Sequence, residues 1–522
     1  MTYLCYDIRG IQSFIFRIPK LKYIIGGSAL IDQFDRETVH QFDRPDTELL
    51  FAGGGKGTFS CSSEDLARGL QKLLCEKAHE IGLDIRFGLN EKYEEASKNA
   101  TEIYPFIPDN LEGKPCNTSG LYPVTGGDEH PVVKKRIYAK GEKTFRWFEK
   151  RLLEGDDTHI GLRNELPEEY REAEFFHDVK SELGSKGSEG AAALGDRNRW
   201  AIICMDGNDM GMQMQEKLKE LKEGRITPEQ MPQWLKAMSS AIDSCSFEAT
   251  KAGIKAVFEK WKDSDDAKKD KKFLPLRPLV VGGDDITVLC HCSYAMDFVK
   301  AAMAKFNEHS KIEDAKAKNG DLKMSVWPAT NGEISISAGV LFAPVTLPLH
   351  SAMAYTEALL ASAKTRGRKE NKKPSVPCVD WEFITNSVID TPAAHRQREL
   401  IFIDEDLGKE VHLTSRPCTM DEFNHIESLC GKYATLPRNV LLKVLPSIRK
   451  CQNDRMEFVA EIAKHQPLLA SHLQEDGFEL PSNEKAEHSL WNINGNSMTT
   501  TVIDAVLLLE EQKRMQKETN ND

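Results

Sequence analysis

The sequence lacks the long apolar runs and the paired cysteines that mark membrane and secreted proteins. Nothing in its 522 residues approaches the roughly eighteen uninterrupted apolar residues of a transmembrane helix. The N-terminal stretch "MTYLCYDIRG" has an aspartate where a secretory signal has its apolar region. The twelve cysteines include no C-x-x-C pair, which argues against a zinc ribbon and a disulfide framework. We therefore expect a cytoplasmic protein with no membrane association.

Proline and positive charge are also in short supply. With only 23 prolines and 40% hydrophobic residues, the chain has the composition of a globular protein, not of a disordered or fibrous one. At this length we expect roughly two to four domains. The 81 acidic and 69 basic residues give a net charge of -12, which disfavours indiscriminate binding to phosphate backbones. Contacts with nucleotides or RNA must therefore come from a local basic patch or through a metal ion.

The closest pair of cysteines, Cys290 and Cys292, encloses His291. Residues two apart on a strand share one face, so these side chains would suit a metal ion. Buried thiols at the end of a strand are the more common arrangement, and we favour that interpretation.

Composition and periodicity divide the chain into a first α/β unit, a linker, a second α/β unit and a helical C-terminal domain, at residues 1–150, 151–194, 195–390 and 391–522. Short apolar runs that alternate with helical spacing indicate the two α/β units. The linker begins as a helix and decays into the Gly- and Ser-rich "SELGSKGSEGAAALGD". Charge-rich stretches at 260–272 and 309–323 are interpreted as solvated loops. Helical periodicity continues to "TTTVIDAVLLLEEQKRMQ" at the end.

The two α/β units share an internal repeat. Aligning "LLFAGGGKGTFSC" with "PLVVGGDDITVLC" pairs Gly53 with Gly282, Gly54 with Gly283, Thr58 with Thr287 and Cys61 with Cys290. Aligning "YLCYD" with "IICMD" pairs Cys5 with Cys204 and Asp7 with Asp206. The two acids of the second stretch are replaced in the first by Gly55 and Lys56. We therefore expect two copies of one unit, of which the second keeps three acids and the first keeps one.

The stretch "VVGGDDITV" is predicted to form a β-hairpin with two carboxylates at its tip. Gly282 and Gly283 permit backbone angles closed to other residues and leave room for a ligand near the turn. On a regular strand Asp284 and Asp285 would point to opposite faces, but at a tight turn both can approach one point. The alternative is a plain polar turn, because Asp and Gly are favoured there for backbone reasons alone.

Asp206 is the candidate for a third carboxylate at that point. It ends the apolar strand "WAIICMD", and α/β sheets usually bind ligands at the C-terminal ends of their strands. Clustered carboxylates repel one another unless a cation such as Mg²⁺ or Mn²⁺ neutralises them. A pair of such ions activates an attacking hydroxyl and stabilises a leaving pyrophosphate. Asn208 and Asp209 follow directly, and for Asp209 we predict capping of the next helix.

Three motifs in each unit carry a family resemblance. The first unit contains "DIRGIQSFIF", "KLKYIIGGSALI" and the acid-free hairpin "FAGGGKGTF", and the second contains "MDGND", "VVGGDD" and "ISAGVLFAP". This order resembles the palm domain of GGDEF-type nucleotide cyclases and polymerases, and more closely the large subunit of type III CRISPR effector complexes. The resemblance implies an α/β (α+β) fold with two ferredoxin-like, cyclase-like palms, a helical linker and a helical C-terminal domain.

The resemblance also assigns roles to single residues. It implies that Asp206, Asp284 and Asp285 are metal ligands and catalytic residues, with Mg²⁺ or Mn²⁺ as cofactor and ATP as substrate. Six further residues would contact nucleotides: Gly282 and Gly283 along the triphosphate, Lys364 of "TEALLASAK" at a phosphate, and Gly53, Gly54 and Lys56 at an acceptor in the first palm. The alternative for Lys364 is a cation that serves only the C-terminal end of its helix.

Two features often found in the family are missing. The first palm strand is predicted to start at about residue 2, so we expect no HD nuclease domain before it. The stretch "FFHDVK" around His177 is interpreted as incidental. Zinc-binding cysteines between the palms are missing as well. The resemblance implies other type III effector subunits and guide or target RNA as partners. From this departure we expect no DNA nuclease domain.

The leading hypothesis is a magnesium-dependent nucleotidyltransferase that makes cyclic oligoadenylates from ATP in an antiviral defence system. A GGDEF-type cyclase that makes cyclic dinucleotides is one alternative. A non-catalytic, nucleotide-binding scaffold subunit of an RNA-guided complex is the other. The base preference, ring size and activating signal stay open at this point.

Overall fold

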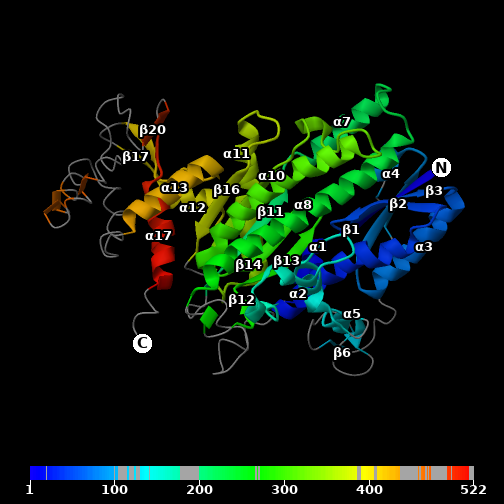
Figure 1. Cartoon of the computed structure of the whole chain (residues 1–522), viewed down its shortest axis with the longest axis horizontal. Coiled ribbons are helices and arrows are strands. Elements are labelled where there is room, and N and C mark those ends of the chain that lie inside the picture. The colour runs from blue at the N-terminus through cyan, green and yellow to red at the C-terminus, as the bar shows by residue number, and fades with distance from the viewer. Residues whose placement is uncertain are drawn as a thin grey trace.

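The computed structural model of the chain contains two large sheets with helices packed on them, and a smaller sheet near the C-terminus (Figure 1). It describes residues 1–18, 20–98, 100, 102–103, 114–116, 123–124, 130–139, 142–176, 199–264, 267–268, 271–384, 390–404, 408–434, single positions between 457 and 471, 491–494 and 497–516. Within these ranges, no helix combines the length and the apolar character that crossing a bilayer requires.

The first α/β unit is a five-stranded antiparallel sheet in the order β2-β3-β1-β4-β5. Its strands are β1 (Thr2–Arg9), β2 (Thr47–Gly53), β3 (Lys56–Cys61), β4 (Asp84–Asn90) and β5 (Glu102–Ile103). The connecting helices are α1 (Ile11–Phe16) and α2 (Leu21–Gln33) after β1, and α3 (Glu64–Glu80) after β3. Ser63 caps α3 by accepting a hydrogen bond from the Leu66 N–H, and Leu70 and Leu74 are buried on one face of that helix.

The second α/β unit is a six-stranded sheet in the order β13-β14-β11-β15-β16-β19. Its strands are β11 (Arg199–Gly207), β13 (Leu276–Gly282), β14 (Asp285–Cys290), β15 (Ile336–Pro344), β16 (Cys378–Phe383) and β19 (Cys418–Thr419). The helices are α7 (Met210–Lys222) and α8 (Gln230–Trp261) after β11, α10 (Ala295–Asn319) after β14, and α11 (Leu349–Lys369) after β15. The first four strands repeat the order and antiparallel pairing of β2-β3-β1-β4, so both units have the βαββαβ topology of a palm.

Strand register confirms the internal repeat. The pairing shifts at aligned places in the two hairpins, between residues 49 and 51 in one and between residues 278 and 280 in the other. The aligned positions across the neighbouring strand also match: Asp7 lies opposite Lys56, and Asp206 lies opposite Asp285. The two hairpins are therefore copies of one structural element that carry different side chains.

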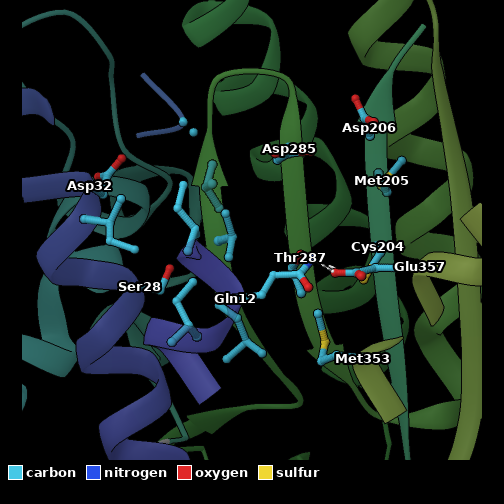
Figure 2. A pocket seen from close by; sticks show the side chains of 18 of the residues that line it. Gln12, Ser28, Asp32, Cys204, Met205, Asp206, Asp285, Thr287, Met353 and Glu357 are labelled. Atoms are coloured by element: carbon cyan, nitrogen blue, oxygen red, sulfur yellow. Dashed lines mark hydrogen bonds between the residues drawn. The ribbon is translucent and has the colours of Figure 1, made fainter. Parts of the chain in front are cut away.

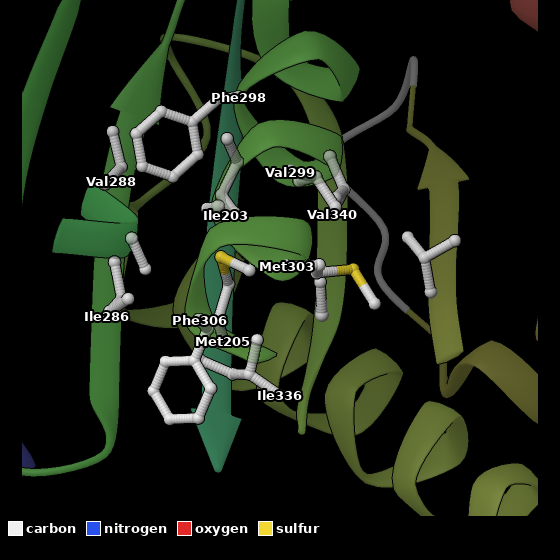
Figure 3. Packing of buried hydrophobic residues seen from close by; sticks show 14 of the residues in the cluster. Ile203, Met205, Ile286, Val288, Phe298, Val299, Met303, Phe306, Ile336 and Val340 are labelled. Atoms are coloured by element: carbon white, nitrogen blue, oxygen red, sulfur yellow. The ribbon is translucent and has the colours of Figure 1, made fainter. Parts of the chain in front are cut away.

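Helices cover both faces of the second sheet (Figure 1). On one face, Ile203 and Val288 of the strands pack with Phe298 and Met303 of α10 (Figure 3). On the other face α11 packs against the strands, together with Ile25 of α2 from the first palm. Each buried side chain of this size contributes about 1.5–3 kcal/mol relative to an exposed one. The strand that carries Asp206 is therefore held from both sides.

The two palms pack against each other reciprocally. Helix α2 of the first palm contacts β13 of the second, and helix α8 of the second palm contacts β2 of the first. In the sequence, each of these helices lies between the first and second strands of its own palm. The two contacts are therefore equivalent and are related by an approximate two-fold symmetry. The hairpin tips meet between these helices, and a Cβ added to Gly53 would lie 3.9 Å from the backbone nitrogen of Gly283.

Two expectations outside the palm sheets are wrong. Residues 309–319 continue α10 and are not a loop, because their charges pair along the helix, as between Glu313 and Lys316. The C-terminal part is not only helical. Besides α12 (Pro392–Glu399), α13 (Met420–Tyr433) and α17 (Val502–Gln516), it holds a sheet of β17 (Ile401–Asp404), β18 (Lys409–His412), β21 (Ser497–Thr500) and β20 (Trp491–Asn494). Strands of four residues are too short to show a clear period of two. The domain boundaries at 150, 194 and 390 stay a prediction.

Candidate functional site

The residues Gly-Gly-Asp-Asp form the predicted hairpin turn. Strand β13 ends at Gly282 and pairs there with Asp285, the first residue of β14. Gly283 has a φ of 58°, which favours glycine. At the end of β11, Gly207 makes room for the turn, because a Cβ there would come within 2.9 Å of the Asp284 Cβ. Glycines thus let the hairpin tip lie directly against the end of β11.

The three predicted carboxylates come together at this tip. One oxygen atom from each of Asp206, Asp284 and Asp285 lies within 4.8 Å of the other two. Within the described part of the chain, no other group of three acidic, histidine or cysteine side chains has this geometry. A set of carboxylate oxygens is what Mg²⁺ and Mn²⁺ prefer as ligands. The plain polar turn left open as the alternative does not account for the third acid from β11.

Desolvation and mutual repulsion disfavour negative charge on two of these acids. The pKa of Asp284 is raised well above its ordinary value, first by burial and then by the charges of Asp285 and Asp206. The pKa of Asp285 is raised to about 7, again by desolvation first and Asp206 second, although solvent reaches its side chain. Lys364 and Lys56 oppose this rise. A bound cation would remove the repulsion, so the donor set fits a divalent metal.

Lys364 of α11 reaches the same cluster. Its ammonium group forms an ion pair with Asp206 and donates a hydrogen bond of 2.9 Å to the carbonyl oxygen of Gly207. Helix α11 continues beyond it to Lys369, so serving the helix end does not explain these contacts. The lysine lies where it can neutralise either carboxylate or phosphate charge.

A cavity of about 460 Å³ opens beside the acids, between the first-palm helices and the second palm (Figure 2). Gln12, Ser28 and Asp32 reach it from the first palm, and Asp206 and Asp285 lie at one end of it (Figure 2). Much of the remaining wall is apolar, with Ile15, Ile24, Ile31, Leu279, Met353 and Leu360. An apolar cavity of this volume with a few polar groups is typical of a small-molecule site.

The hairpin of the first palm contributes to the same place. Gly54 and Gly55 have φ values of 62° and 77°, as in a two-residue turn with both central residues left-handed. Gly54 lines the cavity, and a Cβ there would meet no atom within 4 Å. Lys56 is close enough for its charge to lower the pKa of Asp285. The structure therefore brings Gly54 and Lys56 toward the acids, whereas Gly53 faces the Gly283 backbone.

Asp209 does not cap α7 with its side chain, contrary to the prediction. It occupies the N-cap position with a φ of 63°, but its carboxylate accepts hydrogen bonds from the N–H and hydroxyl of Ser375 at 2.6 and 2.7 Å. Asn208 is buried and donates to the hydroxyls of Ser335 and Ser337. Both side chains therefore hold the loop after β11 against neighbouring segments. For Asp209, hydrogen bonds to a serine far along the chain take the place of the predicted local cap.

Cys290 and Cys292 are buried thiols, as favoured from the sequence. Burial raises the pKa of both thiols above the ordinary value. The Nδ1 atom of His291 accepts a hydrogen bond of 3.2 Å from the Ser293 N–H, and these side chains form no metal-binding group within the described residues. His177 lies outside the described residues.

Four acidic or amide residues of the cavity wall were not predicted from the sequence: Gln12, Asp32, Asp35 and Glu357. Gln12 donates a hydrogen bond to Glu357 and so links the two palms. Asp35 is buried and accepts hydrogen bonds from the Gly55 N–H at 2.7 Å and the Tyr6 hydroxyl at 2.8 Å. The two aspartates are three residues apart at the end of the apolar "GGSALIDQFD", and that helical spacing is the signal that could have revealed them.

Comparison with known proteins assigns the second palm to a family. Residues 199–372 match the family model for Cas10/Cmr2, second palm domain. No curated protein matches the chain in sequence. Among solved structures, the chain is similar to the Csm1-Csm4 cassette in complex with one ATP, with 14% identity, a TM-score of 0.51, and coverage of 98% of this chain and 70% of that chain. For the cassette in complex with cA4, the identity is 13% and the TM-score 0.46, with coverage of 98% of this chain and 70% of that chain.

At these identities the structural similarity establishes the fold, and the family match covers the unit with the three acids. The resemblance read from the motifs is thereby confirmed. Residues 199–372 are a Cas10/Cmr2 second palm domain, and nearly the whole chain shares its fold with the Csm1-Csm4 cassette.

Proposed function

We propose that this chain is a metal-dependent nucleotidyltransferase that joins ATP through 3′–5′ bonds and closes the product into a cyclic oligoadenylate, in antiviral defence. The observation that carries the proposal is the convergence of Asp206, Asp284 and Asp285 beside a cavity walled by both palms. Joining two nucleotides requires that both be held in one orientation, which two facing palms can provide. The Csm1-Csm4 cassette that this chain resembles in fold was solved with one ATP, which agrees with the proposal.

The proposed reaction forms a bond between the 3′-oxygen of one nucleotide and the α-phosphorus of another. The bond from that phosphorus to pyrophosphate breaks, and the hydroxyl proton is released to solvent. Divalent ions held by the three carboxylates would activate the hydroxyl and stabilise the pyrophosphate. Gly282 and Gly283 leave the turn open to the triphosphate, and Lys364 neutralises phosphate charge. Ring closure repeats the step between the two ends of one oligomer.

The first palm receives the acceptor nucleotide in this proposal. Its hairpin has no acid pair that could hold metal ions, but Lys56 can neutralise phosphate charge there. The open space at Gly54 admits a nucleotide next to the turn. Gly53 lies against the Gly283 backbone, where an added Cβ would make only an ordinary van der Waals contact. We further propose that the chain works with other type III effector subunits and with guide or target RNA.

The test is incubation of the purified chain with labelled ATP or GTP and with Mg²⁺ or Mn²⁺, with and without the proteins encoded by neighbouring genes. Cyclic oligoadenylates, identified by chromatography and mass, are the expected product. Cyclic dinucleotides would favour the GGDEF-type alternative. Nucleotide binding without turnover under every condition would leave only a scaffold role. Turnover that needs the neighbouring proteins would place the activity within an effector complex.

A further inference from the structure

The back of the Gly-Gly-Asp-Asp hairpin is held by side chains from outside its own sheet. Ser246 of α8 donates a hydrogen bond of 2.6 Å from its hydroxyl to the carbonyl oxygen of Gly283. Arg151, in the segment that follows the first palm, donates a hydrogen bond of 3.1 Å to the carbonyl oxygen of Val281. Both donors are buried. The two carbonyl groups flank Gly282, so these contacts fix the backbone that leads into the acid pair.

Asp243 joins these contacts to the first palm. It lies one turn before Ser246 on α8 and accepts a hydrogen bond of 2.7 Å from Arg151. It also accepts two hydrogen bonds from Arg36, one of them at 2.9 Å, and Arg36 lies in the helical turn Phe34–Thr38 that directly follows α2 of the first palm. Burial by itself would raise the pKa of Asp243, but the two arginines hold it well below its usual value. One charged carboxylate therefore binds two guanidinium groups from different parts of the chain.

The first palm reaches the hairpin again beside this cluster. Arg36 donates a hydrogen bond of 2.9 Å from Nε to Asp32, which also accepts one of 2.6 Å from the indole of Trp147. A Cβ added to Gly282 would lie 3.2 Å from the Oδ1 atom of Asp32. The contacts therefore run continuously from α2, through Arg36 and Asp243, to both sides of Gly282.

We propose that Asp243 is a positioning residue: through Arg151 it fixes the backbone of the Gly-Gly-Asp-Asp hairpin, and through Arg36 it makes that position depend on the docked first palm. Asp243 does not line the 460 Å³ cavity, so it reaches no nucleotide there. Groups that orient metal ligands from outside typically change metal affinity or activity by about 10–100-fold when removed. The effect on rate rests on the proposed function, whereas the effect on hairpin order does not.

Hydrogen exchange at residues 276–290 of the full chain tests the proposal without an activity assay. Asp243→Asn keeps the size of the side chain but removes the charge that holds both arginines. We expect exchange at the hairpin to become about tenfold faster, as for the loss of a hydrogen bond to a charged group. Hairpin exchange equal to that of the wild type would overturn the proposal.

The matched control is Glu165→Gln. Glu165 pairs at 2.7 Å with Lys251, which lies on α8 as Asp243 does, whereas the hairpin carbonyls accept their hydrogen bonds from Arg151 and Ser246. Its removal should leave hairpin exchange unchanged, and an increase equal to that in Asp243→Asn would show a general loosening of the helix. If Asp243→Asn fails to fold, Ser246→Ala is the milder variant. It removes one neutral donor, and we expect exchange about threefold faster.

The rate of product formation separates positioning from nucleotide binding. Asp243→Asn should lower kcat about tenfold at an unchanged KM for ATP, and Asp243→Glu should recover part of the loss. A raised KM with unchanged kcat would contradict a positioning role. If wild type and variants make no product while hairpin exchange still responds to Asp243→Asn, the positioning role survives and the proposed function fails.

Discussion

In the first palm Asp7 lies opposite Lys56, whereas in the second palm Asp206 lies opposite Asp285. Asp7 forms an ion pair of 3.0 Å with Arg9 on its own strand, so its charge is neutralised locally. Asp206 also has a cation partner, Lys364, but it faces two further acids, and these acids repel one another. The acid at this strand position therefore has its charge balanced in the first palm, whereas in the second palm it belongs to a cluster of acids that repel one another.

Behind the hairpins, the two palms are built alike. The Cys5 Sγ and Thr58 Oγ1 atoms lie 3.4 Å apart in the first palm, and the equivalent atoms of Cys204 and Thr287 lie 3.9 Å apart in the second. The first palm folds around its hairpin without an acid pair, so the fold does not require one. The acids of the second palm cost stability through repulsion, which is typical of residues kept for function.

The largest expected effect is the loss of product formation in Asp206→Ala or Asp285→Ala. Either change withdraws one carboxylate from the proposed metal site and should cost several kcal/mol of charge stabilisation, worth orders of magnitude in rate. Asp285→Ala should leave the protein without metal as stable as the wild type or slightly more so, because the repulsion that raises the pKa of Asp285 is relieved. The measurements are product formation from labelled ATP and the midpoint of thermal unfolding.

Asp7→Ala is the matched control for that prediction, since Asp7 takes the place of Asp206 in the repeat. Its rate should stay within about twofold of the wild type, because the first palm holds no metal in the proposed mechanism. If both second-palm variants kept activity within about tenfold of the wild type, the acid cluster would have no part in the mechanism.

Lys364→Ala is expected to have the next largest effect, a fall of about 10–100-fold in kcat/KM, because it removes a charged hydrogen-bond donor from the site. The variant also loses a cation that lowers the pKa of Asp285, so that pKa should rise further. A metal ligand must be deprotonated, and the acid limb of Mn²⁺ binding should therefore move to higher pH. Calorimetric titration with Mn²⁺ at several pH values measures the shift. If the pH dependence of Mn²⁺ binding were the same in the variant, Lys364 would not affect the pKa values of the acid cluster.

Changes in the first hairpin should raise the KM for ATP about tenfold without removing metal binding in the second palm. Lys56→Ala removes the cation available to the acceptor phosphate, and Gly54→Val fills open space beside the cavity. Valine would also be strained at the φ of 62° that Gly54 adopts. Asparagine tolerates this left-handed region, so Gly54→Asn fills the space with little backbone strain and separates the two effects. Binding of the first metal-bound triphosphate is followed by calorimetry. Unchanged ATP dependence and product length in Gly54→Val would reduce the first palm to a structural partner.

Local patterns made the hairpin and its acids predictable. The glycines indicated a tight turn, and acids at strand ends indicated a binding site. The internal repeat indicated that both units have the same topology. The supports of the hairpin were not predictable, because Asp32, Arg151 and Asp243 meet only when the two palms dock. Asp209 shows the same limit, since a cap is the local solution and Ser375, far along the chain, replaces it.

The smallest expected effect on activity, and a clear one on stability, comes from Asp35→Asn. Asp35 holds the first hairpin through the Gly55 N–H, whereas the second hairpin is held through its carbonyl oxygens. Burial is the main cause that raises the pKa of Asp35 to about 7; the Gly55 N–H, the Tyr6 hydroxyl and Arg36 lower it, and the charge of Asp32 raises it.

The direction of the pH dependence follows from that shift. In the unfolded chain the pKa of an aspartate is about 3.9, so the folded state holds its proton more tightly. This contribution to stability is complete below the unfolded pKa and is lost as the pH rises through about 7, a change of roughly 4 kcal/mol at most. Asparagine has no such proton and can accept from the Gly55 N–H while donating to the Tyr6 oxygen. Denaturant unfolding between about pH 5 and pH 8 should therefore show the variant gaining stability relative to the wild type as the pH rises. If the stability of the two proteins changed in parallel with pH, Asp35 would be ionised in the folded protein. A charged side chain would then hold the first hairpin, as Arg151 does the second.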